Sequence, residues 1–198
     1  MKRGQLLLVA LGFEGALLVL ALALGAAIGA PPFHDLQVSW RAVGQRTAAA
    51  APLLLALSLA TRIRWPPLMR LDREIREIVA RVFARATMID LLVISALAGL
   101  AEEALFRGVI QAGLVPVVGA AGAVLIAAAL FGLAHFISTT YAVYAGVVGI
   151  YLGVLLPISG NLAVPILAHA LYDFLALAYL TRGGSPGGDD GSREETTG

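Results

Sequence analysis

The stretch "GLAEEALFRGVI" at residues 99–110 places two glutamates and an arginine inside a long apolar region. The residues before it, 88–101, read "MIDLLVISALAGLA", and residues 119–134 read "GAAGAVLIAAALFGLA". Hydrophobic residues make up 59% of the 198-residue chain, charged residues make up 14%, and the mean hydropathy is +0.86. Soluble domains are about half apolar and about a quarter charged, so the sequence predicts a polytopic membrane protein of one domain.

Six segments are apolar enough to cross a membrane as helices. A span takes about 20 mostly apolar residues, and the sequence therefore predicts an all-α bundle of about six transmembrane helices. The first segment is expected to be retained, because its apolar run exceeds the roughly 7–15 residues of a signal-peptide core. The predicted spans are residues 6–30, 47–61, 87–108, 117–137, 141–158 and 162–181.

The segment between the second and third spans, "LMRLDREIREIVARVFARATM" at residues 68–88, has apolar residues at helical spacing with arginines between them. This pattern predicts an interfacial amphipathic helix that meets anionic lipid headgroups, with a solvated cytosolic connector as the alternative. Residues 183–198 are glycine-rich and polar, which predicts a disordered cytoplasmic tail. Residues 1–182 then form a single transmembrane domain.

The basic residues give the orientation, because cytoplasmic loops of membrane proteins collect Lys and Arg. Six spans with a cytoplasmic N-terminus place eleven of the fourteen basic residues in the cytoplasm and only Arg41 and Arg46 on the other side. We therefore predict a multi-pass protein of the cell (inner) membrane with both termini in the cytoplasm. The cytoplasmic set is Lys2, Arg3, Arg62, Arg64, Arg70, Arg73, Arg76, Arg81, Arg85, Arg182 and Arg193.

Ionisable side chains inside the predicted spans need partners, because a charge at the bilayer centre costs at least about 2.5 kcal/mol. Glu103 and Arg107 are four residues apart, so they share a helix face and are predicted to form a structural ion pair. Glu102 points about 100° away from Glu103, toward another wall of the bundle interior. In the alternative, both glutamates brace Arg107. Asp90 is predicted to cap a helix, and Glu14 fits either a structural hydrogen bond or a functional role.

Two histidines also lie in the predicted spans. "FGLAHF" puts Phe131 and His135 on one face of the fourth span, and "HALYDF" puts His169 and Asp173 on one face of the sixth. A lone histidine in a membrane more often forms a helix–helix hydrogen bond than a catalytic site. Two histidines that accompany a glutamate pair, on helices that can converge, favour a site of chemistry.

Three of these stretches carry a family resemblance. "EEALFR", "FGLAH" and "HALYD" are similar to the EExxxR, FxxxH and HxxxN/D patterns of the CPBP family, in the expected order. This family contains the CAAX prenyl endopeptidases and the bacteriocin-processing or bacteriocin-immunity Abi proteins. The resemblance covers roughly residues 87–180 and implies an intramembrane protease. Asp173 is a departure, because the eukaryotic-type CAAX enzymes have asparagine there.

The resemblance implies hydrolysis of a peptide bond within the membrane. The chain has no cysteine, and no serine lies beside a histidine at helical spacing on these motifs, so water is the predicted nucleophile. Glu102 is the predicted general base, with His135 holding or polarising the same water. His169 and Asp173 are predicted to face the substrate carbonyl, where His169 donates to the oxyanion.

The metal requirement stays open at this point. Glu102, His135 and His169 would suit a zinc ion with an open water position, whereas the H-E-x-x-H signature of soluble proteases is absent. The family has been described both as metalloproteases and as glutamate-dependent proteases, and we favour the metal-free version. The predicted partners are a peptide or membrane-protein substrate and the lipid bilayer, with no nucleic acid. The alternative functions are a non-proteolytic scaffold or bacteriocin-immunity factor, and a proton-coupled transporter.

Overall fold

The computed structural model describes residues 2–37 and 48–182, and every regular element in this part of the chain is a helix. The predicted all-α fold is confirmed. The predicted tail, residues 183–198, and the two arginines assigned to the outer loop, Arg41 and Arg46, lie outside the described residues. The elements are α1 (Arg3–Ile28), the 3₁₀ turn η2 (Ala48–Ala50), α3 (Ala51–Arg62), α4 (Pro66–Phe83), α5 (Met88–Glu103), the π-helix η3 (Ala104–Gln111), α6 (Ala112–Ala134), α7 (Thr139–Ser159) and α8 (Ala163–Arg182).

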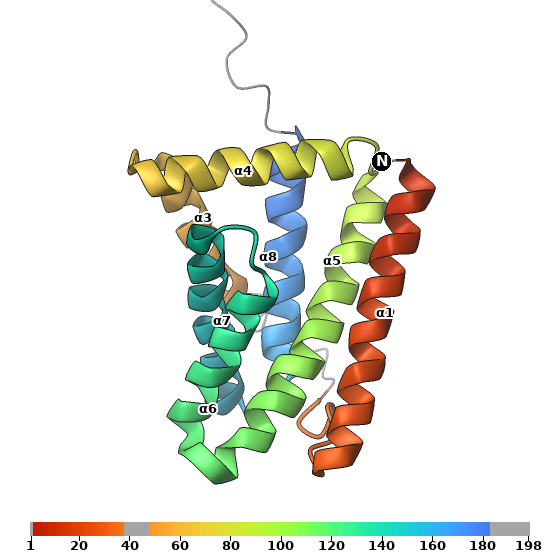
Figure 1. Cartoon of the computed structure of the whole chain (residues 1–198), viewed down its shortest axis with the longest axis vertical. Helices are drawn as coiled ribbons and strands as arrows, with labels where there is room; N and C mark the ends of the chain where they lie inside the picture. The colour runs from red at the N-terminus through yellow and green to blue at the C-terminus, as the bar shows by residue number, and fades with distance from the viewer. Residues whose placement is uncertain (1, 38–47, 183–198) are drawn as a thin grey trace, which may run out of the picture.

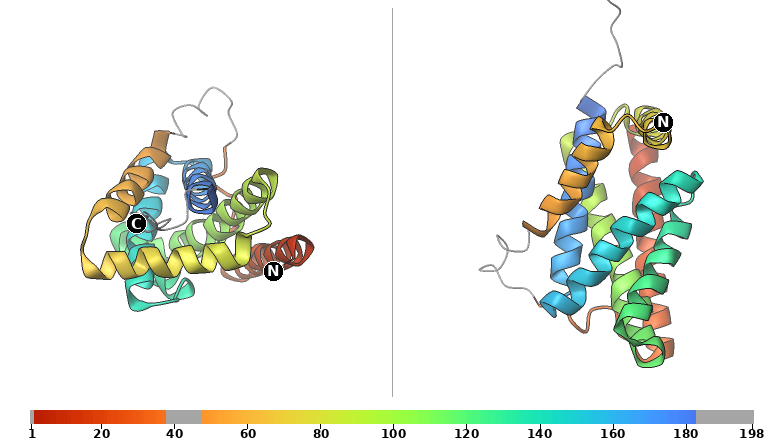
Figure 2. Two further views of the ribbon diagram at one scale, coloured as in Figure 1. Left: turned by 90° about the horizontal axis from the view of Figure 1, so that it is seen from above. Right: turned by 90° about the vertical axis from the view of Figure 1, so that its left-hand side faces the viewer.

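The helices form a bundle with one helix laid across its end (Figure 1). α1, α5 and α8 run along the bundle, and α4 crosses the end at which α1 begins and α8 finishes. Figure 2 shows the same crossing from above. α5 packs against both α1 and α8, while α6 packs against α7 and η3. The centre of the bundle is therefore built from α5, η3 and α8, with α1 on one side and the α6–α7 pair on the other.

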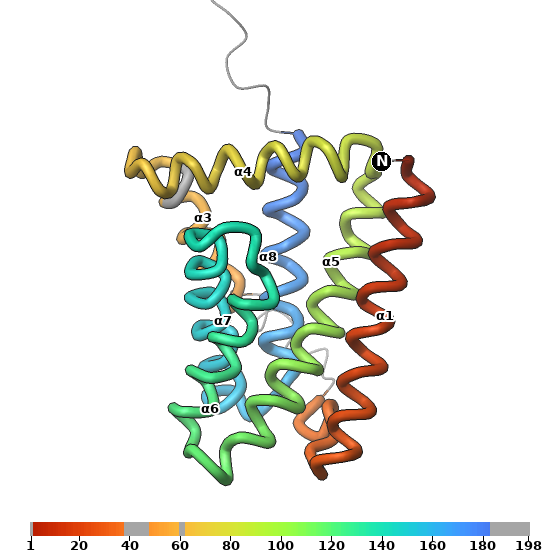
Figure 3. Tube along the Cα trace, viewed as in Figure 1, coloured from red at the N-terminus to blue at the C-terminus, as the bar shows by residue number. Residues whose placement is uncertain are grey.

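Four helical stretches in the described part of the chain are long and apolar enough to cross a membrane. One of them, Met88–Ala134, reverses at Gly119, whose φ of 72° and ψ of 169° suit glycine. Figure 3 shows this reversal, which makes the stretch a hairpin that contains the third and fourth predicted spans. The second predicted span is a shorter apolar stretch, Ala48–Leu59. The four long stretches are Arg3–Ile28, Met88–Ala134, Thr139–Ser159 and Ala163–Arg182.

The connection between the third and fourth predicted spans lies further along the chain than the sequence indicated. Residues 109–116, expected to be a loop, are helical and include Pro116. The polar side chain that lowers the hydropathy there has a partner, because Gln111 Nε2 donates to the carbonyl oxygen of Gly153 at 2.9 Å. A buried amide that is hydrogen-bonded does not break a helix, so the helix continues and the chain reverses at Gly119.

A capping box and an ion pair fix the start of α5. Thr87 Oγ1 accepts from the N–H of Asp90, and Asp90 Oδ2 accepts from the N–H of Thr87, which satisfies two free donors of the helix N-terminus. Arg3 Nε and Nη2 donate to the two oxygens of Asp90 at 2.7 and 2.9 Å. Asp90 therefore caps α5, as predicted, and also joins it to the beginning of α1.

α4 is the amphipathic helix that the sequence predicted. Leu71 and Val79 are buried, whereas Arg70, Arg73 and Arg81 are exposed. Apolar and charged residues on opposite faces are typical of a helix that lies on an apolar surface. The apolar face of α4 covers the end of the bundle, and Arg70, Arg73 and Arg81 are exposed on the other side of the helix.

Glycines allow the helices that carry the polar residues to pack closely. A Cβ atom at Gly99 of α5 would lie 2.9 Å from the backbone nitrogen of Ala170 on α8. A Cβ atom at Gly149 of α7 would lie 3.2 Å from Cα of Ala128 on α6. Small residues line such interfaces in membranes because they let backbones approach. This packing brings the three motif-bearing regions, at the end of α5, the end of α6 and the middle of α8, toward one another.

Candidate active site

Glu103 and Arg107 lie at the centre of the site, and both side chains are fully buried. Arg107 Nη1 donates to Glu103 Oε1 at 2.8 Å, and Arg107 Nη2 donates to the carbonyl oxygen of Gly149 on α7 at 2.8 Å. His169 Nδ1 lies 2.8 Å from the same Oε1 and donates to it, because an ionised carboxylate only accepts. One carboxylate oxygen therefore joins α5, η3 and α8.

The π-helix η3, Ala104–Gln111, begins directly after the two glutamates. Short π-helical turns inside longer helices occur frequently at functional sites. Arg107 and Gln111 donate to the carbonyl oxygens of Gly149 and Gly153, which are likewise four residues apart on α7. A Cβ atom at Gly153 would lie 2.9 Å from Gln111 Oε1, so glycine is needed for this approach. η3 and α7 are thus held together by two polar contacts in the interior.

Glu102 faces a different partner from Glu103. Its Oε2 lies 3.5 Å from His135 Nε2 and is buried without a hydrogen bond to any described residue. His135 Nδ1 lies 2.9 Å from the carbonyl oxygen of Phe131. Because a carbonyl only accepts, Nδ1 carries the hydrogen, and a neutral imidazole then has its lone pair at Nε2. Two acceptors, Glu102 Oε2 and His135 Nε2, therefore share one space.

His169 lies between two acids. Its Nδ1 contacts Glu103, and its Nε2 lies 3.4 Å from Oδ2 of Asp173, one helical turn further along α8. The His169 side chain is 5% exposed, whereas that of Asp173 is 31% exposed. The hydrogen bond at Nδ1 fixes the orientation of the His169 ring. Nε2 then faces the more exposed Asp173 and the space beside the cluster.

The ring of Phe131 holds the three motifs together. Its centroid lies 4.3 Å from that of His135 and 5.8 Å from that of His169. Arg107 Cζ lies 4.7 Å from the same centroid, which is within the range of a cation–π contact. Phe106 packs edge-on against Phe131 at 5.1 Å. Phe131 is therefore packed against residues of all three motifs.

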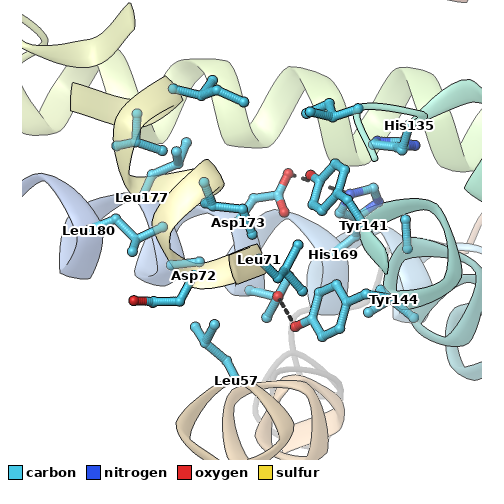
Figure 4. A pocket seen from close by; sticks show the side chains of 18 of the residues that line it. Leu57, Leu71, Asp72, His135, Tyr141, Tyr144, His169, Asp173, Leu177 and Leu180 are labelled. Atoms are coloured by element: carbon cyan, nitrogen blue, oxygen red, sulfur yellow. Dashed lines mark hydrogen bonds and ion pairs between the residues drawn. The ribbon is translucent and has the colours of Figure 1, made fainter. Parts of the chain in front are cut away.

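A cavity of about 270 Å³ lies between this cluster and α4. Figure 4 shows His135, His169 and Asp173 at one part of its wall. Tyr144 and Tyr172, whose hydroxyl groups are hydrogen-bonded to each other, also line the cavity. The remaining wall is largely apolar and includes Leu57, Leu68, Leu71, Ile75, Val79 and Leu177. The cavity can therefore hold an apolar chain beside the histidines and Asp173.

The residues that would suit a zinc ion, Glu102, His135 and His169, are not brought together as one set of ligands. Among residues 2–37 and 48–182, no three side chains of the His, Cys, Asp and Glu types are grouped as metal ligands would be. Glu102 contacts His135, while His169 is engaged at Nδ1 by Glu103 and faces Asp173 at Nε2. Adding a chelator to the cleavage assay tests whether the reaction depends on a metal ion.

Three features of the site are not apparent in the motifs. The contact between Glu103 and His169 joins residues 66 positions apart, which no helical spacing indicates. Tyr141 and Tyr144 line the cavity together with Tyr172, and the only sequence signals are their spacing of three and the adjacency of Tyr172 to Asp173. The third feature is Glu14 of α1, which is 8% exposed and lies on the side of the bundle that faces α5.

Comparison with known proteins gives one result. Residues 84–175 match the family model described as type II CAAX prenyl endopeptidase, Rce1-like. The matched segment contains both glutamates, both histidines of the site and Asp173, whereas α1 and α3 lie outside it. No curated protein and no solved structure matches the chain.

Proposed function

Because residues 84–175 match the model of the Rce1-like type II CAAX prenyl endopeptidase family, we propose that the protein is an intramembrane endopeptidase that uses an activated water. The observation that supports this most directly is the pair of free acceptors, Glu102 Oε2 and His135 Nε2, 3.5 Å apart. A water molecule between two acceptors donates one hydrogen to each. Its oxygen lone pairs then point toward a third direction, where a carbonyl carbon can approach.

In the first step, Glu102 acts as the general base. It takes one proton from the water while the water oxygen bonds to the carbonyl carbon, and the carbonyl π electrons move to the oxygen. His135 accepts the hydrogen bond of the second water hydrogen and keeps the nucleophile in position. The hydrogen bond from His135 Nδ1 to Phe131 supports this role, because it leaves Nε2 as the acceptor.

In the same step, His169 stabilises the oxyanion. Its protonated Nε2 donates to the negative oxygen, while Nδ1 is held by Glu103, and Glu103 in turn by Arg107. Preorganised donors of this kind cost no reorganisation when charge develops. Asp173, 3.4 Å from Nε2, orients the ring at its other nitrogen.

In the second step, the tetrahedral intermediate collapses. The carbon–nitrogen bond breaks, its electron pair stays on nitrogen, and Glu102 returns its proton to the leaving amine. Glu102 is therefore base and acid in turn, which requires a carboxylate that no permanent cation holds. Its lack of a hydrogen-bonded partner among the described residues supports this use.

The cavity beside the histidines supports a peptide or membrane-protein substrate with an apolar segment. Most of its wall is apolar, and the α4 residues that line it include the two buried residues of that helix, Leu71 and Val79. The exposed arginines on the opposite face of α4 would meet anionic headgroups. A substrate would then approach from the end of the bundle that α4 covers, between the lipid surface and the cluster.

The bundle places the start of α1 and the end of α8 at the end covered by α4, and we propose that this end faces the cytoplasm. Reporter fusions at the C-terminus and in the loop of residues 31–46 should then report opposite sides of the membrane. Equal locations for the two reporters would overturn this orientation.

The direct test is cleavage of a peptide library by the purified protein. Glu102→Gln keeps the shape of the side chain but cannot take the proton, so activity should fall by about 10²–10⁴. Glu77→Gln, an acid-to-amide change at an exposed position of α4, is the matched control. Full activity in Glu102→Gln would end the hydrolase proposal at this site. Activity lost with a chelator and restored by zinc would instead make Glu102 and the histidines metal ligands.

The same variant separates the alternative functions. A scaffold or immunity factor would keep its cellular function after Glu102→Gln, since that function does not need a base. A transporter would give an uptake signal when the purified protein is placed in liposomes.

A further inference from the structure

Glu14 is the one acid on the buried face of α1. The helix is otherwise apolar and largely exposed along its length, as a helix that faces lipid would be. Its buried residues are Leu6, Glu14, Ala21 and Gly25, which lie on the side of α1 that packs against α5 and η3. A buried glutamate among these residues costs free energy, because an ionisable group in a membrane interior loses its hydration. Such groups normally have a partner or a function.

The register of α1 against α5 puts Glu14 level with the site. Arg3 pairs with Asp90 at one end of the contact, and a Cβ atom on Gly25 would lie 3.3 Å from Val109 at the other. The two helices run in the same direction (Figure 1). Glu14 is eleven residues from both Arg3 and Gly25, so it lies near the midpoint of the stretch between Asp90 and Val109. That midpoint is within about one helical turn of the two catalytic-motif glutamates.

The charges around Glu14 are those of the site. Glu14 interacts electrostatically with His169 and Asp173, and Glu102 in turn interacts with Glu14. Its Oε2 is buried and has no hydrogen-bond partner in the part of the chain that the structure describes. Buried polar atoms are nearly always paired in folded proteins, so an unpaired carboxylate oxygen at this position indicates a role beyond packing.

His169 is the group that needs this charge. Its hydrogen-bonded acid, Glu103, is already shared with Arg107, and its other acid, Asp173, lies 3.4 Å from Nε2 and is 31% exposed. His135 on α6 is a second imidazole within the same cluster and offers no negative charge. Two buried carboxylates near His169, those of Glu14 and Glu102, form no hydrogen bond with a described cation. Glu102 is the proposed base and gains and loses a proton during the reaction, so Glu14 is the one whose charge can stay beside His169.

We propose that Glu14 is a positioning residue of the active site, whose buried carboxylate stabilises the protonated imidazole of His169. This rests on the proposed function, in which His169 donates to the oxyanion. α1 then contributes to catalysis although it lies outside the segment that matches the family model. Charge on a group that does not touch the substrate acts through the donor it stabilises, so its loss should appear in kcat rather than in KM.

The kinetic test compares three changes at one position. Glu14→Gln removes the charge and keeps the shape, and kcat should fall about 10- to 100-fold with KM within about twofold of wild type. Glu14→Asp keeps the charge and should recover most of the lost activity. Glu14→Leu removes both charge and polarity, and should match Glu14→Gln in kcat if charge is what matters. Glu77→Gln is again the control for an acid-to-amide change.

A double variant separates positioning from a purely structural role. If Glu14 acts through His169, Glu14→Gln should lower kcat no further in a His169→Ala background. A structural role would instead lower the melting temperature in detergent and reduce activity equally in both backgrounds. Additive losses in the double variant, or unchanged kcat in Glu14→Gln, would overturn the proposal while leaving the proposed function intact.

A second measurement does not depend on substrate. The chain has three histidines, so their ¹⁵N imidazole signals can be assigned in the full-length protein by substituting each in turn. Glu14→Gln should move the His169 signals toward the pattern of neutral imidazole and leave those of exposed His34 unchanged. Unmoved His169 signals would overturn the proposal even if wild-type protein cleaves no peptide, an outcome that would by itself refute only the proposed function.

Discussion

Two acid–arginine pairs in this protein share their spacing and their length but not their surroundings. Asp72–Arg76 on α4 and Glu103–Arg107 at the junction of α5 and η3 are both four residues apart, with the closest N–O distance 2.8 Å in each. The α4 side chains are 34% and 22% exposed, whereas those of the interior pair are 0% exposed. Helix geometry gives both pairs the same contact, and the surrounding medium determines the interaction energy of that contact.

The difference lies in what replaces a lost partner. Water can solvate Asp72 if Arg76 is removed, so the surface pair contributes little. Neither water nor lipid headgroups reach Glu103, and its removal would leave Arg107 as an uncompensated charge. The interior pair also anchors His169 and α7, so its geometry carries over to the reactive part of the site.

The same contrast separates the two adjacent glutamates. Glu103 accepts two hydrogen bonds at 2.8 Å, while Glu102 has only the 3.5 Å approach of His135. We interpret the closely bonded acid as the one that holds the site and the loosely paired acid as the one that reacts.

The largest effect is expected where the water is held. Glu102→Gln and His135→Ala should each lower the rate by about 10²–10⁴, because the first removes the base that takes the proton and the second removes an acceptor that holds the same water. The double variant should be little worse than either single variant, since residues that act as a unit are not additive. Single-turnover cleavage by the purified variants measures this. A double variant whose loss is the product of the single losses would show that the two groups act separately.

The interior pair should show its effect in stability. Glu103→Ala or Arg107→Ala should cost about 3–5 kcal/mol by leaving one charge buried and unpaired. Glu102→Ala should cost less, because it removes an acid that no described arginine contacts. Thermal unfolding in detergent and folded yield are the measurements. Equal losses for all three variants would contradict the division between the two glutamates.

The next largest loss of rate is expected for variants of His169 and Asp173. His169→Ala and Asp173→Ala should each lower the rate by about 10²–10³, the usual effect of losing one oxyanion donor or its orienting group. Asp173→Asn should keep most of the activity, because an asparagine can still orient the ring through its amide. A loss in Asp173→Asn as deep as that in Asp173→Ala would show that the charge of Asp173 is required.

Local patterns were enough to predict most of the fold. Hydropathy indicated the long apolar helices, and the alternation of arginines with apolar residues indicated amphipathic α4, because both signals depend only on neighbours along one helix. The spacing of Glu103 and Arg107 indicated their contact for the same reason. The turn of the α5–α6 hairpin was misplaced, because the chain stays helical through residues 109–116. The buried Gln111 there donates to the carbonyl oxygen of Gly153, which lies on another helix.

The contacts between helices could not be predicted from the sequence. The bond between Glu103 and His169 depends on how α8 is rotated against α5, which the packing at Gly99 and Ala170 determines. The register of α1 depends on the ion pair between its first residue and Asp90, so the position of Glu14 beside the site could not be predicted from its own surroundings. Interhelical register is a property of the packed bundle and of no single segment.

The smallest effect is expected on α4. Asp72→Asn or Arg76→Gln should change stability by about 0.3–0.5 kcal/mol at most, the usual value of a helical i,i+4 pair at a surface. The hydrogen bond from Arg76 to Asp72 raises the pKa of Arg76, so the arginine stays charged at all working pH values and salt alone screens the pair. Thermal unfolding in detergent at low and at about 0.5 M salt measures both terms, because surface pairs lose strength as the Debye length shortens. A loss in Asp72→Asn comparable to that in Glu103→Ala would break the comparison between the two pairs, and would mean that Arg76, which also lies over the ring of Tyr179 on α8, is needed to hold α4 on the bundle.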